Sequence, residues 1–224
     1  LYDAMIRPIE GLLEDPEVDT LVVVPDGLLR TIPFAAFHDR KRRRFLVDVK
    51  PMALVPSLRL TQPSSLAREE LSILAAGLEK ATAGFPRLDY TREEIDGLRT
   101  RFPDTRVLWG DAFAPASLEE EIRTRPYSVV HVATHGRVAA DGRESFLLTR
   151  DGLLGLDDVA RMIQTTRFRQ DTPLELLTLS ACETAAGDED AALGLAGVAL
   201  RAGARSALAT LWPVNDEATA RLID

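Results

Sequence analysis

Between residues 71 and 212, short apolar runs alternate with amphipathic stretches, and this rhythm restricts the fold more than any other feature of the sequence. The apolar runs have the length of β-strands and comprise 71–78, 105–109, 127–133, 174–181 and 205–212. The amphipathic stretches have helical spacing and comprise 91–102, 117–125, 156–163 and 191–202. Residues 144–155 read as a hairpin. Strand–helix alternation of this kind predicts an α/β fold with a mostly parallel sheet and helices on both faces of the sheet.

The beginning of the chain does not follow that alternation. Residues 2–15 space their apolar side chains along one helical face. Residues 20–37 and 45–57 read as extended chain, the first of them interrupted by a proline–glycine turn. We therefore expect a β-rich N-terminal part, residues 1–64, followed by an α/β core, residues 65–224.

The composition excludes several classes of protein. Apolar residues are 46% and charged residues 28% of the chain, as in globular proteins, and the net charge of -8 argues against direct nucleic-acid binding. No apolar run approaches the ~20 residues that span a membrane, and no signal peptide is recognisable. The single cysteine fits a reducing cytoplasm. Because the sequence opens without Met and stops within a helical pattern, we expect it to be part of a longer polypeptide.

Two of the apolar runs end in a polar side chain followed by small residues. The run "YSVVHVATHG" holds His131 and ends at His135 and Gly136, and the run "LELLTLSAC" ends at Cys182. Open α/β sheets place their sites outside the carboxyl ends of the strands, and adjacent strands are only ~4.8 Å apart. If these two strands are neighbours, His135 and Cys182 project from the same edge of the sheet.

Other interpretations of the same residues are weaker. Four residues of a strand span ~13 Å, so His131 and His135 are too far apart to share a metal ion. His131 is better explained as a core residue with a hydrogen-bonded ring. A lone buried cysteine often behaves as a small apolar residue, but the small residues around Cys182 leave room for a substrate backbone. The sequence contains none of the common nucleotide-binding, zinc-protease or serine-hydrolase motifs.

The two motifs "HVATHG" and "LSACETAAG" resemble those of the CHAT-domain peptidases, caspase-like cysteine proteases of the same broad clan as caspases and separase. The segments "LVVVPDGLLRTIPFAAF", "VPS" and "GARSALATLWPVNDEAT" also resemble family segments, in the family's order. The resemblance implies a caspase-like fold, a His135–Cys182 dyad, a protein substrate and no cofactor. It also implies a regulatory helical-repeat or sensor module as partner, and a bacterial signalling or defence setting.

The implied chemistry assigns roles to individual groups. Cys182 would attack a peptide carbonyl as the thiolate, and His135 would protonate the leaving amine and then activate water. The backbone N–H groups of Gly136 and Cys182 would bind the developing oxyanion. The alternative for Gly136 is a helix cap or turn glycine. The alternative function is a catalytically silent caspase-like scaffold that binds other proteins. A thiol redox sensor is disfavoured because the sequence holds no second cysteine.

The residues that set specificity are harder to assign. Several caspase-like relatives that cleave after Arg or Lys carry an acid two positions before the cysteine, where this sequence has Ser180. Asp216, in a stretch that resembles a separase segment, offers a replacement, and Trp212 would line the pocket or the core. The alternative for Asp216 is a cap of the last helix. Finally, five consecutive basic residues, 40–44, form either a solvated hairpin loop or a docking patch.

Overall fold

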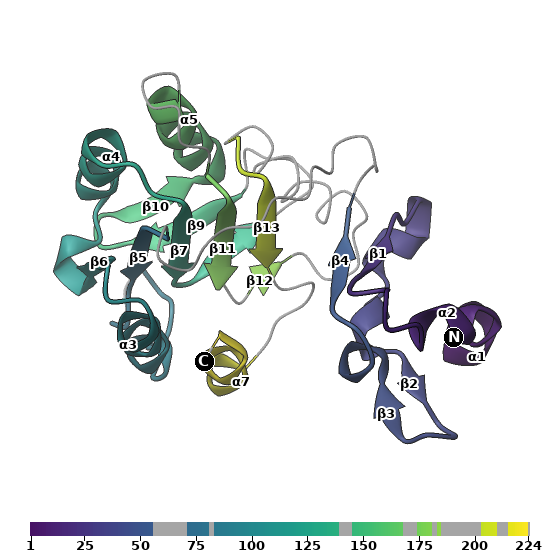
Figure 1. Cartoon of the computed structure of the whole chain (residues 1–224). Coiled ribbons are helices and arrows are strands. Elements are labelled where there is room, and N and C mark those ends of the chain that lie inside the picture. Colours follow the sequence, from purple (N-terminus) through teal and green to yellow (C-terminus); the bar gives the residue numbers. More distant parts are fainter. Residues whose placement is uncertain are drawn as a thin grey trace. The chain divides into compact units, whose positions relative to one another are not determined.

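A computed structural model describes residues 1–55, 71–80, 83–138, 145–167, 174–180, 183–184, 203–209 and 215–223. The chain divides into two compact units, Leu1–Pro63 and Ser64–Asp224, whose elements are labelled in Figure 1. Cys182 and Trp212 lie outside the described residues. Over the described part of the chain, no helix has the length and apolar character needed to cross a membrane.

The larger unit is built on a five-stranded parallel sheet (Figure 1). In spatial order its strands are β13 (Ser206–Ala209), β11 (Leu176–Ser180), β7 (Val129–Ala133), β5 (Ile73–Gly77) and β6 (Thr105–Trp109). Every neighbouring pair of these strands runs parallel. The predicted α/β fold with its mostly parallel sheet is confirmed, and each strand lies within one of the apolar runs of the sequence.

Helices cover both faces of this sheet (Figure 1). One face carries α4 (Pro115–Thr124) and α5 (Leu156–Arg167), and the other carries α3 (Thr91–Arg101) and α7 (Asp216–Ile223). The α4–α5 face holds the main core, because alternate strand residues such as Val130 and Val132 pack there against Leu118 and Val159. A short 3-10 turn, η7 (Gly110–Ala112), follows β6.

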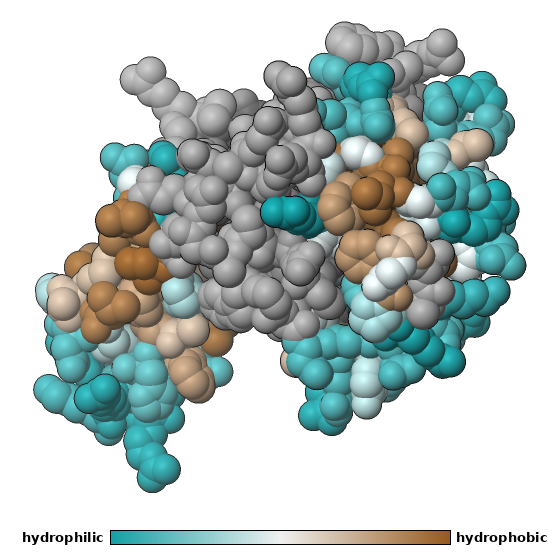
Figure 2. Space-filling model, turned by 180° about the vertical axis from the view of Figure 1, so that it is seen from behind, coloured by the Kyte–Doolittle hydropathy of each residue, from teal (hydrophilic) through white to brown (hydrophobic). Residues whose placement is uncertain are grey.

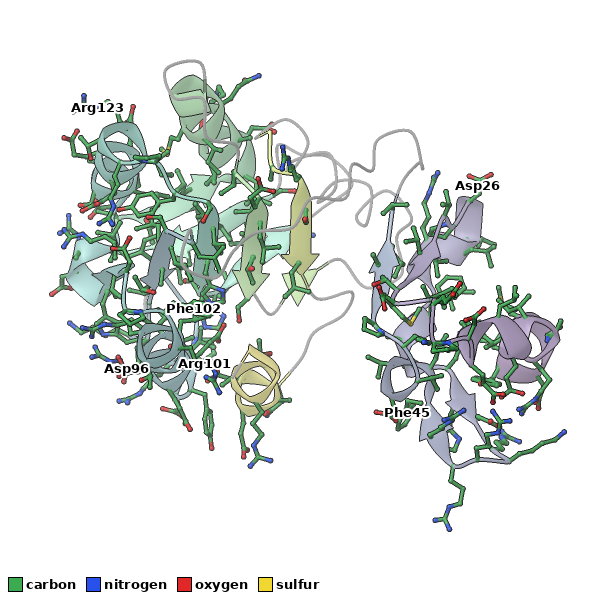
Figure 3. The ribbon with its side chains drawn as sticks, viewed as in Figure 1. Asp26, Phe45, Asp96, Arg101, Phe102 and Arg123 are labelled. Carbon is green, nitrogen blue, oxygen red and sulfur yellow. The ribbon has the colours of Figure 1, made fainter. Side chains whose placement is uncertain are left out.

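The α3 face of the sheet is thinner and more polar. Its apolar cluster consists of Ala75, Ile95 and Ala133, with larger side chains packed only at its border. A Cβ added at Gly77 would lie 2.5 Å from Cδ1 of Ile95 and 2.9 Å from the ring of Trp109, so α3 approaches the sheet as closely as it does only because residue 77 is glycine. The opposite side of α3 is charged, and Figure 3 labels Asp96 and Arg101 there.

A second, smaller sheet continues from the carboxyl ends of two central strands. Its strands, in spatial order, are β10 (Gly152–Gly155), β9 (Phe146–Thr149), β8 (Gly136–Val138) and β12 (Glu183–Thr184). The predicted hairpin within residues 144–155 is confirmed as the antiparallel pair β9–β10. The short strands β8 and β12 were not predicted, because two or three residues carry no readable alternation.

The N-terminal unit differs from the expected helix followed by extended chain. The helix predicted over residues 2–15 is divided into α1 (Tyr2–Met5), η1 (Arg7–Ile9) and α2 (Glu10–Leu13). Pro8 accounts for the division, because proline lacks an N–H group and its ring clashes with the preceding helical turn.

The extended segments of this unit are also shorter than predicted. Within the described part of these segments, the longest strands are β1 (Leu21–Val23) and β4 (Met52–Leu54), and they pair in parallel. Between them lie the 3-10 turns η2 (Gly27–Thr31), η3 (Phe34–Ala36) and η4 (Leu46–Asp48). The carboxylate of Asp26, labelled in Figure 3, accepts the N–H of Gly27 at 2.9 Å, and Gly27 has a φ of +52°. This cap starts a helical turn where continuous extended chain was expected.

The basic run lies in a hairpin of the same unit. Strands β2 (His38–Asp39) and β3 (Arg44–Phe45) pair in antiparallel fashion around residues 40–43, so the predicted hairpin loop is confirmed. Arg42 in that loop contacts Glu10 and Glu14 of α2. Part of the positive charge of the run is therefore neutralised within the unit.

Apolar side chains also reach the surface of the N-terminal unit. In β1 and just after it, Val22 and Val24 alternate with the core-packed Leu21 and Val23 and remain 40% and 44% exposed. Figure 2 shows apolar residues, coloured brown, gathered on this unit at the left of the view.

Candidate active site

Strands β7 and β11 are neighbours, which is the condition on which the predicted site depended. Ala133 pairs with Ser180, and the N–H of Thr134 donates to the carbonyl oxygen of Ser180 at 3.1 Å. His135 follows Ala133 by two residues, as Cys182 follows Ser180. The strand end that precedes the cysteine in the sequence therefore lies beside the strand end that precedes the histidine.

The same two segments pair again immediately beyond this edge. Glu183 of β12 pairs in parallel with Arg137 of β8. Three residues separate Ala133 from Arg137, whereas two separate Ser180 from Glu183. The segment that carries His135 is thus one residue longer than the segment beside it, as in a β-bulge.

The ring of His135 is held by two neighbours. Its Nε2 atom lies 2.8 Å from the carbonyl oxygen of Pro86. The centroids of the Phe85 and His135 rings are 5.1 Å apart. Because a carbonyl oxygen can only accept a hydrogen bond, the contact with Pro86 requires the proton on Nε2, and the neutral ring then has Nδ1 as its acceptor. The backbone is held as well, since the carbonyl of His135 accepts the N–H of Leu148 at 2.7 Å.

Gly136 presents its backbone N–H away from β9. Since Leu148 donates to the carbonyl of His135, Gly136 and its partner Leu147 form a non-hydrogen-bonded pair of the antiparallel ladder. In such a pair the N–H of each residue points away from the partner strand. The N–H of Gly136 is therefore directed to the side of its strand on which β12 lies.

Asp216 is bound to the start of another helix. Its Oδ2 atom accepts the N–H of Tyr90 at 2.8 Å, and its carboxylate also accepts the N–H of Asp89. It therefore caps α3, whereas Asn215 caps the helix to which Asp216 itself belongs. Burial raises the pKa of Asp216 above its usual value; the two N–H groups counteract the rise, and the charge of Glu94 adds to it.

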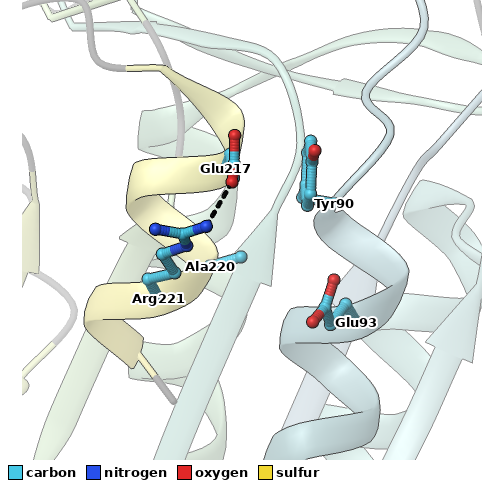
Figure 4. Close-up of a pocket in the computed structure, with 5 residues that line it drawn as sticks. All are labelled: Tyr90, Glu93, Glu217, Ala220 and Arg221. Atoms are coloured by element: carbon cyan, nitrogen blue, oxygen red, sulfur yellow. Dashed lines mark hydrogen bonds and ion pairs between the residues drawn. The ribbon is translucent and has the colours of Figure 1, made fainter.

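A small pocket opens beside this cap, between α3 and α7 (Figure 4). Its walls are Tyr90, Glu93, Glu217, Ala220 and Arg221. Glu217 and Arg221 form an ion pair on α7, one turn apart. The pocket is lined by helix side chains and does not include His135.

A buried carboxylate and a buried imidazole face each other beneath the same edge of the sheet. The side chains of Glu94 and His131 are 1% and 3% exposed, and Oε1 of Glu94 lies 2.8 Å from Nε2 of His131. The hydroxyl of Ser180 donates to Oε2 of Glu94 at 3.1 Å. The Nε2 atom of His131 and Oε1 of Glu94 are close, but their geometry is not that of a hydrogen bond. The hydrogen bond from Ser180 is therefore the better-formed of the two contacts of Glu94. His131 is thus a core residue, as predicted. The predicted hydrogen bond of its ring is not formed at Nε2, which has no hydrogen-bond partner among the described residues.

Two groups at this edge had no signal in the sequence. The acceptor on Pro86 is a backbone carbonyl, which no motif marks. Glu94 lies in the charged stretch "TREEIDG", where it looks like any solvent-facing helical glutamate. Among the described residues, no cluster of His, Cys, Asp and Glu has the composition to hold a metal ion.

The comparison with known families agrees with this architecture. The sequence profile of the CHAT domain matches residues 1–224, the whole of the sequence. No curated protein matches the chain. A parallel sheet flanked by helices, with a histidine segment and a cysteine segment on neighbouring strands, fits the caspase-like fold of that family. The chain therefore belongs to the CHAT-domain family, a caspase-like, peptidase-related group.

Proposed function

We propose that this protein is a cysteine endopeptidase in which Cys182 attacks a peptide carbonyl and His135 serves as its base. The double pairing of the two segments carries the proposal: Ser180 before the cysteine and Glu183 after it both pair with the chain that holds His135. Two residues of chain span at most ~7 Å. This chain length supports a position of Cys182 close to the histidine segment.

The His135 tautomer suits a base. With its Nε2 proton directed to Pro86, the ring offers Nδ1 to the thiol. A free cysteine has a pKa of about 8.5, so proton transfer from Sγ to Nδ1 supplies the thiolate that a neutral thiol lacks. The thiolate adds to the carbonyl carbon, and the imidazolium protonates the amine as the C–N bond breaks. The neutral ring then takes a proton from the water that attacks the thioester, and the thiol is regenerated.

The oxyanion of the tetrahedral intermediate needs backbone donors. We assign this role to the N–H groups of Gly136 and Cys182. The direction of the Gly136 N–H, away from β9 and toward the side of β12, supports the assignment. A donor fixed by the ladder needs no reorganisation when charge develops on the oxygen.

The proposed substrate carries Arg or Lys at the cleaved position. Asp216, Ser180 and Trp212 are the residues assigned to its side-chain pocket. Within the described residues, no Lys or Arg pairs with Asp216, and Glu94 adds negative charge nearby. A site with unneutralised carboxylates favours a basic side chain, because guanidinium and ammonium groups would supply the missing counter-charge.

The biological setting is part of the proposal. A single cysteine and an acidic composition are consistent with a cytoplasmic protein. Membership of the family suggests a regulatory helical-repeat or sensor module as partner and a role in bacterial signalling or defence. Activity would then depend on the partner, which orders loops at the strand ends.

The experiment that tests the function is a comparison of proteolysis in a bacterial proteome. The intact protein and its Cys182→Ala variant are incubated with the proteome, and new peptide N-termini are identified by mass spectrometry. New termini that require Cys182 support the endopeptidase. Partner proteins retained equally by both forms, with no new termini, would instead identify a scaffold.

A further inference from the structure

The α3 face of the sheet carries a polar line that the proposed mechanism does not use. In the parallel register, Thr178 lies beside His131 and Ser180 beside Ala133, so the side chains of all four point to the same face. Glu94 approaches this face from α3 and reaches His131 on β7 and Ser180 on β11. One carboxylate therefore accepts a hydrogen bond from the strand that leads to Cys182 and lies 2.8 Å from a ring nitrogen on the strand that leads to His135.

The position of Glu94 is fixed by close packing. The next residue, Ile95, is 1% exposed and rests against Gly77 with no room for a Cβ between them. Glu94 itself is 2% exposed. A displacement of α3 away from the sheet would expose Ile95 and break both contacts of the Glu94 carboxylate. The packing of α3 against the sheet therefore holds the carboxylate in place.

Stability alone is a poor explanation for this arrangement. Removing a carboxylate and an imidazole from water carries a large desolvation cost, and apolar replacements of buried ion pairs are often as stable or more so. Buried polar groups of this kind are better explained by a unique geometry that they enforce, which is a hypothesis to be tested in each protein.

The contacts of Ser180 and Thr134 extend the connection to the proposed dyad. Ser180 binds Glu94 through its hydroxyl and Thr134 through its carbonyl oxygen, and His135 directly follows Thr134. The hydroxyl of Thr134 donates to the carbonyl of Leu148 at 2.7 Å, and Leu148 returns a hydrogen bond to His135. An unbroken series of bonds thus runs from Glu94 to the backbone of the histidine.

We propose that Glu94 is a positioning residue, whose carboxylate fixes the ends of β11 and β7 and thereby the spacing between Cys182 and His135. The inference rests on the proposed dyad. Glu94 touches neither the substrate nor the reacting atoms, and acts through Ser180 and His131. Its loss should therefore weaken the coupling of thiol and imidazole while the fold persists.

Alkylation of the single cysteine tests this without any substrate. The rate of reaction of Cys182 with iodoacetamide is measured from pH 5 to 9.5 in the intact protein, because only the thiolate reacts. The variants are Glu94→Gln, which keeps the side-chain volume, and Ser180→Ala, which removes a single oxygen. His135→Ala reports loss of the dyad, and Glu93→Gln, at the exposed neighbouring position on α3, is the matched control.

We expect Glu94→Gln to slow alkylation at pH 6.5 by about 10-fold or more and to move the midpoint of the profile toward that of free cysteine, as His135→Ala does. Ser180→Ala should move it in the same direction, and Glu93→Gln should leave it unchanged. If only His135→Ala moves the midpoint, the dyad stands and the positioning role is wrong. Should Glu94→Gln fail to fold, Ser180→Ala makes the same comparison.

A wild-type profile like that of free cysteine would mean that the dyad itself is wrong. Hydrogen exchange of residues 129–138 then tests whether the Glu94 carboxylate fixes the strand ends even without a dyad. Faster exchange in Glu94→Gln than in Glu93→Gln supports a carboxylate that fixes the strand ends, and equal exchange overturns that role.

Discussion

The Nε2 atom of His135 and the carbonyl oxygen of Pro86 lie 2.8 Å apart, although 49 positions separate the two residues in the sequence. The contact selects one of the two neutral tautomers of the ring, because the carbonyl can only accept. It also orients the ring with the help of Phe85. The orienting group of the proposed base is thus main chain, and no side-chain substitution can remove it directly.

The first prediction concerns the proposed dyad. Cys182→Ala and His135→Ala should each lower the cleavage rate by at least about 1,000-fold, because nucleophile and base act as one unit. Thermal unfolding of both variants should stay close to wild type. His38→Ala is the matched control, since this exposed histidine lies in the N-terminal hairpin. Near-normal cleavage by either dyad variant would show that the assignment is wrong.

The second prediction concerns the buried pair. His131→Leu should lower the free energy of unfolding by about 1–3 kcal/mol, because Oε1 of Glu94 stays buried and loses its nearest polar neighbour. The double variant Glu94→Leu/His131→Leu should be less destabilised than His131→Leu alone. Urea unfolding of His131→Leu, Glu94→Leu and the double variant measures the coupling between the two side chains. Strictly additive effects would mean that the two side chains do not interact.

The third prediction is a pH dependence at Asp216. Its pKa is raised in the folded protein, so its stabilising contribution is fully present below the unfolded pKa and is lost as the pH rises through the folded pKa. Asp216→Asn removes this dependence and retains an oxygen for the Tyr90 N–H. The variant should therefore gain stability relative to wild type between pH 3 and pH 7 in urea unfolding. The opposite trend would mean that the two N–H groups outweigh burial.

The fourth prediction concerns the cleaved position. Cleavage sites should carry Arg or Lys immediately before the broken bond, and Asp216→Ala should cost about 2–5 kcal/mol of transition-state binding for such substrates. Glu119→Gln, at an exposed position of α4, serves as the control. A cleavage profile dominated by apolar or acidic residues would leave Asp216 with its observed role alone, as the cap of α3.

Much of the larger unit could be predicted because its strands are largely apolar runs separated by charged stretches. The runs around His131 and Thr178 differ so clearly from the charged stretches between them that strand positions follow directly. The N-terminal unit was less predictable. There, Asp26 and Gly27 begin a helical turn, and Pro8 divides a helix whose apolar spacing reads as continuous.

The site could be predicted only in part. Strand ends and polar residues pointed to His135 and Cys182, but whether the two strands were neighbours depended on tertiary structure. Glu94 could not be found at all, because a helix exposes most of its glutamates and the pattern around it is typical of a surface. Its burial follows from Gly77, on a strand that the sequence does not connect with it.

The pairing of Ala133 with Ser180 and of Arg137 with Glu183 restricts how the length of this chain can change. Deleting one residue between Ala133 and Arg137 would shift β8 by one position and turn each of its side chains to the opposite face. An insertion between Ser180 and Glu183 would do the same to β12. We therefore expect these two short intervals to tolerate no insertion or deletion, even where substitution at the same positions is harmless.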